Sequence, residues 1–142
     1  MELGYTFQEV FEVARDSEDH KLKLPQLFTP RHSGTAQFSY EFRKLRLTLD
    51  YTSKIMGPQH LPSYPAPFSR KEKSEWFSLS NFQVTKKAGK TIEIYAGVKN
   101  LFNWTQGSPL INPAQPFDPS FDTAYVYGPT QGRRYFLGLR AT

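Results

Sequence analysis

In Thr35-Ala36-Gln37-Phe38-Ser39-Tyr40-Glu41-Phe42-Arg43, every second side chain is apolar and the side chains between them are polar. A period of two places alternate side chains on opposite faces of a β-strand. The same alternation recurs, with some irregularity, in residues 3–11, 45–55, 76–86, 91–99 and 134–141. The chain is therefore predicted to form about six long strands.

Two details qualify this pattern. Within residues 76–86 the apolar positions change phase between Leu79 and Phe82, which predicts a β-bulge near Asn81. No segment has a convincing helical period. The predicted fold class is all-β, an antiparallel up-and-down meander.

The links between the predicted strands alternate in length. Residues 42–44 and 87–89 form short links, whereas residues 15–33, 57–74 and 105–131 form long ones that hold nearly all of the 11 prolines. If consecutive strands pair antiparallel, all long loops lie at one end of the sheet. Short turns at one end and long loops at the other are typical of outer-membrane barrels.

Strand length and ring content favour a membrane setting. A tilted strand needs about 9–11 residues to cross the hydrocarbon, whereas soluble strands average about 5–6. Aromatic residues make up 15% of the chain, and rings at strand ends suit the interfacial girdles of a barrel. The candidate girdle residues are Tyr5, Tyr51, Trp76, Trp104, Tyr127 and Tyr135.

Other membrane and secretory features are not expected. The absence of cysteine excludes disulfides and thiolate zinc sites. No run of about 18 apolar residues predicts a transmembrane helix, and the first residues lack the pattern of a signal peptide. Six strands do not close a membrane barrel, so the chain is expected to be part of a larger barrel or a protomer of an oligomeric one.

Three motifs carry a resemblance to a known family. The stretch Gly97-Val98-Lys99-Asn100-Leu101-Phe102-Asn103 resembles a signature near the penultimate strand of TonB-dependent outer-membrane receptors. The end, Gly128-Pro129-Thr130-Gln131-Gly132-Arg133-Arg134-Tyr135-Phe136-Leu137-Gly138-Leu139-Arg140, is similar to the final strand of that family, and Thr29-Pro30-Arg31-His32 resembles its T-P-x-H motif. The motif residues are Gly97, Asn100, Leu101, Phe102, Asn103, Gly132, Arg133 and Gly138.

The resemblance implies that residues 1–142 are one C-terminal segment, the last six strands of a 22-stranded transmembrane β-barrel in the outer membrane of a Gram-negative bacterium. The barrel would import a scarce solute such as an iron chelate, cobalamin or an oligosaccharide. Its partners would be outer-membrane lipid and the N-terminal barrel and plug segments, which this chain lacks. TonB would act only through that plug. The family usually ends in an aromatic residue, whereas this chain ends in Thr142.

The polar side chains of the predicted strands are the main functional candidates. On the face opposite the rings they would look into the lumen, where they contact the plug and tune passage. This lumen-facing set is Gln37, Ser39, Glu41, Arg46, Thr48, Asp50, Glu93, Lys99 and Arg140. In the last long loop, Phe117, Phe121, Tyr125 and Tyr127 are candidates for closing over a ligand, although self-packing of the loop is an alternative.

Other chemistry receives little support from the sequence. We expect His20, His32 and His60 to be solvated loop residues rather than metal ligands. The acidic groups Asp16/Glu18/Asp19 and Asp118/Asp122 lack the spacing of a calcium loop. We predict no cofactor and, because no nucleophile or facing carboxylate pair is present, no enzymatic activity.

The net charge of +5 does not indicate nucleic acid binding, because the rings and the charges fall on opposite faces. The cluster Arg70-Lys71-Glu72-Lys73 is expected to be solvated or to contact anionic lipid headgroups. Two alternatives to the receptor segment stay open at this point. One is a soluble ligand-binding antiparallel β-module with an internal apolar core, and the other is a small barrel formed by oligomerisation.

Overall fold

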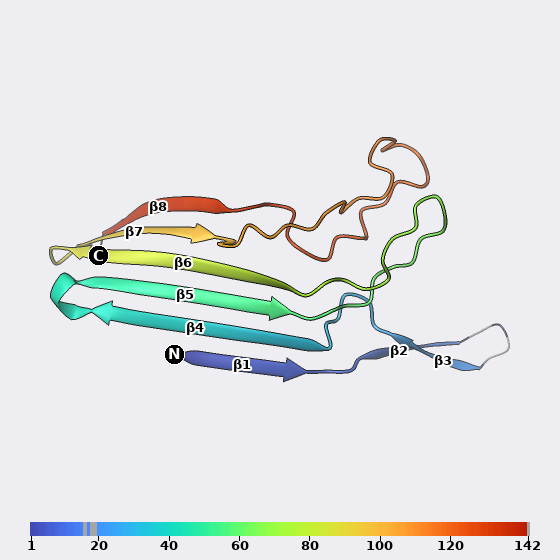
Figure 1. The fold of residues 1–142 in the computed structure, drawn as a ribbon, viewed down its shortest axis with the longest axis horizontal. Coiled ribbons are helices and arrows are strands. Elements are labelled where there is room, and N and C mark those ends of the chain that lie inside the picture. Colours follow the sequence, from blue (N-terminus) through green and yellow to red (C-terminus); the bar gives the residue numbers. More distant parts are fainter. Residues whose placement is uncertain (16, 18–19, 142) are drawn as a thin grey trace.

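One antiparallel sheet of six strands dominates the computed structural model, which describes residues 1–15, 17 and 20–141. The strands lie in the order β1-β4-β5-β6-β7-β8, so each pairs with its chain neighbour apart from an inserted hairpin (Figure 1). Their bounds are β1 Glu2–Phe7, β4 His32–Phe42, β5 Leu47–Met56, β6 Phe77–Ala88, β7 Ile92–Lys99 and β8 Arg134–Ala141. The predicted all-β, up-and-down meander is confirmed.

The long loops lie at one end of this sheet (Figure 1). Residues 8–31, 57–76 and 100–133 connect strands there, whereas β4–β5 and β6–β7 are joined at the other end by short turns. Strand β1 begins and strand β8 ends toward the short-turn end (Figure 1). Because the sheet is an up-and-down meander, the alternation of link lengths in the sequence becomes a difference between its two ends.

The first long link contains a hairpin that the sequence analysis did not predict. Strands β2 (Phe11–Arg15) and β3 (Lys21–Pro25) pair with each other and project beyond the loop end of the main sheet (Figure 1). The predicted strand over residues 3–11 is therefore too long, because β1 ends at Phe7 and the chain enters a different sheet at Phe11.

The turn between β4 and β5 also differs from the prediction. A single 3-10 turn, η1 (Arg43–Leu45), occupies the position, and Arg46 follows it with a left-handed φ of 49°. Strand β5 therefore begins at Leu47 rather than Leu45. The left-handed residue reverses the chain so that Leu47 pairs with Phe42.

The predicted bulge near Asn81 is wrong. Strand β6 pairs with β5 without a break from Phe77 to Lys86, and Thr52 lies opposite Asn81. The change of phase has another cause: Phe77 points to the polar face, where the ring of Trp104 from the last loop stacks on it at 4.4 Å between centroids. A loop covers that end of the polar face, so an apolar side chain there is buried without any slip in register.

The register gives the sheet one apolar and one polar face. Cross-strand partners place these side chains on the apolar face: Leu3, Tyr5, Phe7, Phe38, Tyr40, Phe42, Leu47, Leu49, Tyr51, Ile55, Phe82, Val84, Ile92, Ile94, Val98, Tyr135, Leu137 and Leu139. Many of these stay open to solvent, including Tyr135 (76% exposed), Leu137 (77%) and Leu139 (71%). In the part of the chain that the structure describes, no second layer of the fold covers this face.

The main cluster of buried hydrophobic residues lies in the loops, whereas the strands contribute only Phe77 and Val98 as buried hydrophobic residues among those described. Leu61, Ile111 and Tyr125 form its buried centre, and Tyr64, Phe68 and Tyr127 pack around it. These residues come from the 57–76 and 100–133 loops, which bind each other beyond the ends of the strands. No helix among the described residues has the length and apolar character needed to cross a membrane.

Candidate functional site

The polar face of the sheet carries most of the predicted lumen-facing set. Strand register places eight of the nine residues on this one face: Gln37, Ser39, Glu41, Thr48, Asp50, Glu93, Lys99 and Arg140. Direct partners hold several of them. The Ser39 hydroxyl donates to Asp50 Oδ1 at 2.7 Å, and Arg140 Nη1 donates to Glu93 Oε2 at 3.2 Å. Four of the eight residues on this face are therefore held in hydrogen-bonded pairs.

Arg46 is the exception in this set. It lies in the turn after η1, where its Nη1 donates to the carbonyl of Gly89 in the neighbouring short turn at 3.2 Å. Its own carbonyl accepts a hydrogen bond from the Lys87 amide at 2.9 Å. Arg46 was predicted to lie in a strand and to face the lumen with the rest of this set. It lies in the turn instead, because β5 begins one residue later. Arg46 instead connects the two short turns.

Two rings on the polar face lie over glycines of the neighbouring strand. Tyr95 of β7 faces Gly138 of β8, and Phe136 of β8 faces Gly97 of β7. A Cβ added to Gly138 would lie 2.3 Å from Tyr95 Cζ, and one added to Gly97 would lie 2.4 Å from Phe136 Cζ. The glycines thus leave room for the two rings, as in the aromatic rescue of glycine in designed sheets. This gives a packing reason for two of the motif glycines.

Asn100 ties the end of β7 to the start of β8. Its side-chain amide donates to the carbonyls of Trp104, at 2.7 Å, and Gln131, at 3.1 Å. Its Oδ1 accepts the Trp104 amide at 3.0 Å, and its own backbone amide donates to Asn81 Oδ1. A buried asparagine with a φ of 53° therefore satisfies backbone groups from two segments at once.

Asn103 directly connects the two sequence motifs around Asn100 and Arg133. Its Oδ1 accepts the Arg133 amide at 2.8 Å, and a Cβ on Gly132 would lie 2.6 Å from that oxygen. Between the two asparagines, Leu101 donates its amide to the Ser80 carbonyl at 2.7 Å, while the Phe102 side chain is exposed. The motif residues that lie far apart in the sequence thus form one hydrogen-bonded unit at the loop end of β6, β7 and β8.

The candidate ligand loop divides into two parts. Tyr125 is buried in the loop core and donates from its hydroxyl to the Lys71 carbonyl at 2.9 Å, and Tyr127 packs on Phe77 and Trp104. Burial raises the pKa of both tyrosines. Phe117, in contrast, is 100% exposed, and Phe121 is half-buried. The structure does not bring the four rings together around one space.

The loop core also holds a polar pair. The Tyr64 hydroxyl donates to Asp122 Oδ2 at 2.7 Å, and the Ala124 amide donates to Asp122 Oδ1 at 2.8 Å. Burial, and then the bond to Asp122, raise the pKa of Tyr64 to about 12. The same hydroxyl lowers the pKa of Asp122. This pair connects the 57–76 loop to the 100–133 loop.

The remaining acidic candidates engage local partners. Asp118 accepts the Ser120 amide and hydroxyl, which lower its pKa. Asp16, Glu18 and Asp19 lie outside the described residues. Among residues 1–15, 17 and 20–141, no three histidine or acidic side chains gather as they would around a metal ion.

An aromatic row crosses the loop end of the apolar face. His32 opens β4, lies opposite Phe7, and stacks on Trp76 at 6.1 Å between ring centroids. The Tyr5 hydroxyl lies 2.8 Å from His32 Nδ1. Gly57 lies beside this stack: a Cβ there would be 3.2 Å from Trp76 Cη2 and 2.8 Å from the His32 carbonyl oxygen. The expectation that His32 is a solvated loop residue is wrong, because it packs in this row.

Other predicted girdle rings differ in position. Tyr5, Trp76 and Tyr135 lie toward the loop end of the apolar face, and Tyr51 lies further along β5. Trp104 and Tyr127 are not on that face, because they pack on Phe77 from the polar side. Only some of the six rings therefore have a position suited to an interface.

No family model matches this chain, and no curated protein or solved structure matches it either. The features of the chain that can indicate a function are therefore the two faces of the sheet, the motif unit and the aromatic row. The polar face and the motif residues were predictable from the sequence, whereas the packing of Phe7, His32 and Trp76 beside Gly57 was not. The members come from four separate segments, so only the strand register brings them together.

Proposed function

We propose that this chain is the C-terminal part of an outer-membrane importer of the TonB-dependent receptor type. In this proposal its six strands complete a larger barrel, and transport depends on strands and a plug supplied by other polypeptide. The solute belongs to the large, scarce class, such as an iron chelate, cobalamin or an oligosaccharide. The observation that carries the proposal is the exposed apolar face of a long-stranded sheet whose other face is polar.

The apolar face supports a lipid contact. A soluble sheet buries its apolar face against another layer, since apolar area removed from water stabilises the fold by about 25 cal/mol per Å². Here Leu3, Leu137 and Leu139 stay mostly exposed. Lipid would remove them from water without a second protein layer.

The two sheet edges support a larger assembly. The outer edges of β1 and β8 have no paired strand in the described chain, and unpaired backbone groups cost several kcal/mol each in hydrocarbon. In a complete barrel, a preceding strand would pair with β1 and the first barrel strand would pair with β8. The polar face, with its Ser39–Asp50 and Glu93–Arg140 pairs, would then line the lumen.

The first test is whether the chain needs detergent. We expect it to aggregate in detergent-free buffer and to become monodisperse in micelles, with bound detergent measured by analytical ultracentrifugation. A monodisperse monomer without detergent would overturn the proposal and favour the soluble module.

A pair of matched variants assigns the bound detergent to one face. Leu137→Ser with Leu139→Ser, on the apolar face, should reduce the bound detergent. Gln37→Ser with Thr52→Ser, on the polar face, should leave it unchanged. An equal loss in both variants would contradict a lipid-facing apolar surface.

A barrel made of several copies is the second candidate. The directions of the two edge strands are compatible with it. Because the main sheet is an even-numbered antiparallel meander, β1 and β8 run in opposite directions. The β8 edge of one copy can therefore pair antiparallel with the β1 edge of the next. A sedimentation mass of two or more chains in micelles would support this candidate over the receptor segment.

A further inference from the structure

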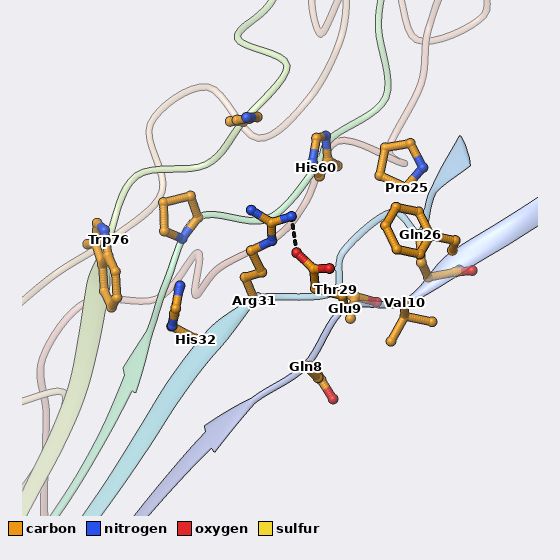
Figure 2. A pocket seen from close by; sticks show the side chains of 13 residues that line it. Gln8, Glu9, Val10, Pro25, Gln26, Thr29, Arg31, His32, His60 and Trp76 are labelled. Carbon is orange, nitrogen blue, oxygen red and sulfur yellow. Dashed lines mark ion pairs between the residues drawn. The ribbon is translucent and has the colours of Figure 1, made fainter. Parts of the chain in front are cut away.

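A pocket lies where the aromatic row meets the long loops. It has a volume of about 450 Å³ and is lined by the start of β4, the hairpin β2–β3 and both ends of the 57–76 loop. His32 and Trp76, at the edge of the apolar face, form part of its wall (Figure 2). The pocket therefore borders the surface that the proposed function assigns to lipid.

The charge of the pocket is mainly basic. Arg31, Lys73 and His60 line it, and Glu9 is the only acid among its lining residues. Glu9 forms an ion pair with Arg31, drawn as a dashed line in Figure 2. Among the described residues, Lys73 has no ion-pair partner. The residue is also exposed. An anion in the pocket could contact Lys73 directly and would compete with Glu9 for Arg31.

The order of side chains along the strands matches a membrane interface. Apolar residues such as Leu3 occupy the strands, then Tyr5, Phe7, His32 and Trp76 gather at their loop end, and the basic groups follow in the loops. Amphipathic rings prefer the headgroup level of a bilayer. Cationic groups just beyond that level lie where the lipid phosphates are.

From these positions we infer that the pocket binds the phosphate of an anionic lipid headgroup. Lys73 and Arg31 are the cationic contacts, and the His32–Trp76 stack contacts the part of the lipid next to the headgroup. This inference rests on the proposed function for its source of phosphate. Charged hydrogen bonds from lysine and arginine to phosphate supply the affinity. The same chemistry would also accept free inorganic phosphate, so the two sources must be separated by experiment.

The test uses the full chain in zwitterionic micelles, with Trp104→Phe as background so that Trp76 reports by fluorescence. The probes are short-chain phosphatidylglycerol, short-chain phosphatidylcholine and inorganic phosphate. We expect saturable binding of phosphatidylglycerol, about tenfold weaker in Lys73→Gln because one charged contact is lost. Lys90→Gln, in the short turn at the far end of the sheet, is the matched control and should not change the affinity.

A second variant has the opposite expected sign. Glu9→Gln removes the competing acid and frees Arg31, so phosphatidylglycerol should bind several-fold more tightly. Damage to the fold would not produce that gain. Equal affinities for all three variants and the parent chain, or equal binding of phosphatidylcholine, would overturn the inference.

Three further outcomes distinguish the source of the phosphate, the failure of the inference and the failure of the proposed function. If inorganic phosphate binds as tightly as phosphatidylglycerol, the pocket is a free-phosphate site and the lipid assignment is wrong. If phosphatidylglycerol does not bind while the chain still requires detergent, the inference fails and the proposed function stands. If the chain is monodisperse without detergent, the proposed function fails first.

Discussion

The sheet and its loops differ in how far they bury their apolar side chains. The strands of the sheet are regular and hydrogen-bonded, yet many large apolar side chains such as Tyr40 and Leu139 remain exposed. The loops are irregular and rich in proline, yet they bury Leu61, Ile111 and Tyr125 in a small core. In most compact domains the sheet supplies the core and the loops stay at the surface.

This difference in burial indicates that the loops and the sheet obtain their stability from different interactions. The loops supply their own core and cross-links, among them the Tyr64–Asp122 bond and the Asn100 bonds. The sheet has backbone pairing, but no second layer of the described chain covers its apolar face. We therefore expect substitutions in the loop core to act on the chain itself, and substitutions on the apolar face to act through lipid.

Ile111→Ala should have the largest effect. Ile111 is 1% exposed at the centre of the loop core, and truncating such a side chain typically costs about 2–5 kcal/mol. Urea unfolding in micelles, followed by tyrosine fluorescence, measures the loss. Phe117→Ala, in the same loop but fully exposed, is the control and should have little effect. Equal stability of the two variants would contradict this expectation, because burial of Ile111 would then contribute little to the stability of the loops.

Leu49→Arg tests the apolar face. A cation on the lipid side costs about 2–4 kcal/mol near the bilayer midplane, so this variant should insert poorly into lipid vesicles, as measured by protease protection. Thr48→Arg is the control on the adjacent position. It points to the polar face and lies opposite Glu41, a carboxylate that can pair with the new cation. Equal insertion of both variants would contradict the assignment of the faces.

Asn100→Ala tests the motif unit that joins the sheet to the loops. It removes the side-chain bonds to Trp104 and Gln131, and buried groups left unpaired cost about 1–3 kcal/mol. Asn100→Gly separates two causes, because glycine tolerates the φ of 53° but also lacks the amide. We expect urea unfolding to show a loss in both variants, smaller in glycine. Full stability of Asn100→Gly would mean that only the backbone conformation matters.

The Tyr64–Asp122 pair should produce the smallest effect, a pH dependence of the contact between the loops. Because the pKa of Asp122 is lowered on folding, its contribution is present above the ordinary aspartate range and is lost as the pH falls through the lowered value. Tyr64 behaves in the opposite sense, since its contribution is lost as the pH rises toward about 12. The contact should thus be strongest between about pH 4 and 10.

Ultraviolet absorbance of tyrosinate measures this titration. In Asp122→Asn, the pKa of Tyr64 should fall toward its ordinary value but stay above it, because burial also raises the pKa. Tyr40→Phe, on the sheet and outside the pair, is the control and should leave the titration of Tyr64 unchanged. No change in the tyrosinate titration of Asp122→Asn would contradict the role of the bond.

The strands were predictable from the sequence because a period of two is a local signal. Phe38, Tyr40 and Phe42 alternate with polar residues, so the face of each follows from its neighbours. The hairpin β2–β3 was missed because its strands are short and lie in a segment that resembled a link. Arg46 was misplaced by a turn whose left-handed residue carries no glycine signal.

The loop core and the aromatic row depend on contacts that no local pattern contains. Leu61 and Ile111 sit among prolines without a period, and their contact depends on two loops meeting. Phe77 gave a false signal of a bulge, because the phase of a strand does not reveal that Trp104 covers its polar side. The row at His32 and Gly57 required the register of three strands.

The reciprocal fit of Tyr95 over Gly138 and Phe136 over Gly97 has a consequence for assembly. A slip of β8 by two residues would place Tyr95 opposite Phe136 or Arg140, so that its ring no longer lies over a glycine. Only the observed register of β7 and β8 places both rings over glycines. The pair of β7 and β8 thus specifies its own register through side chains, although residues 100–133 separate the two strands and no short turn aligns them.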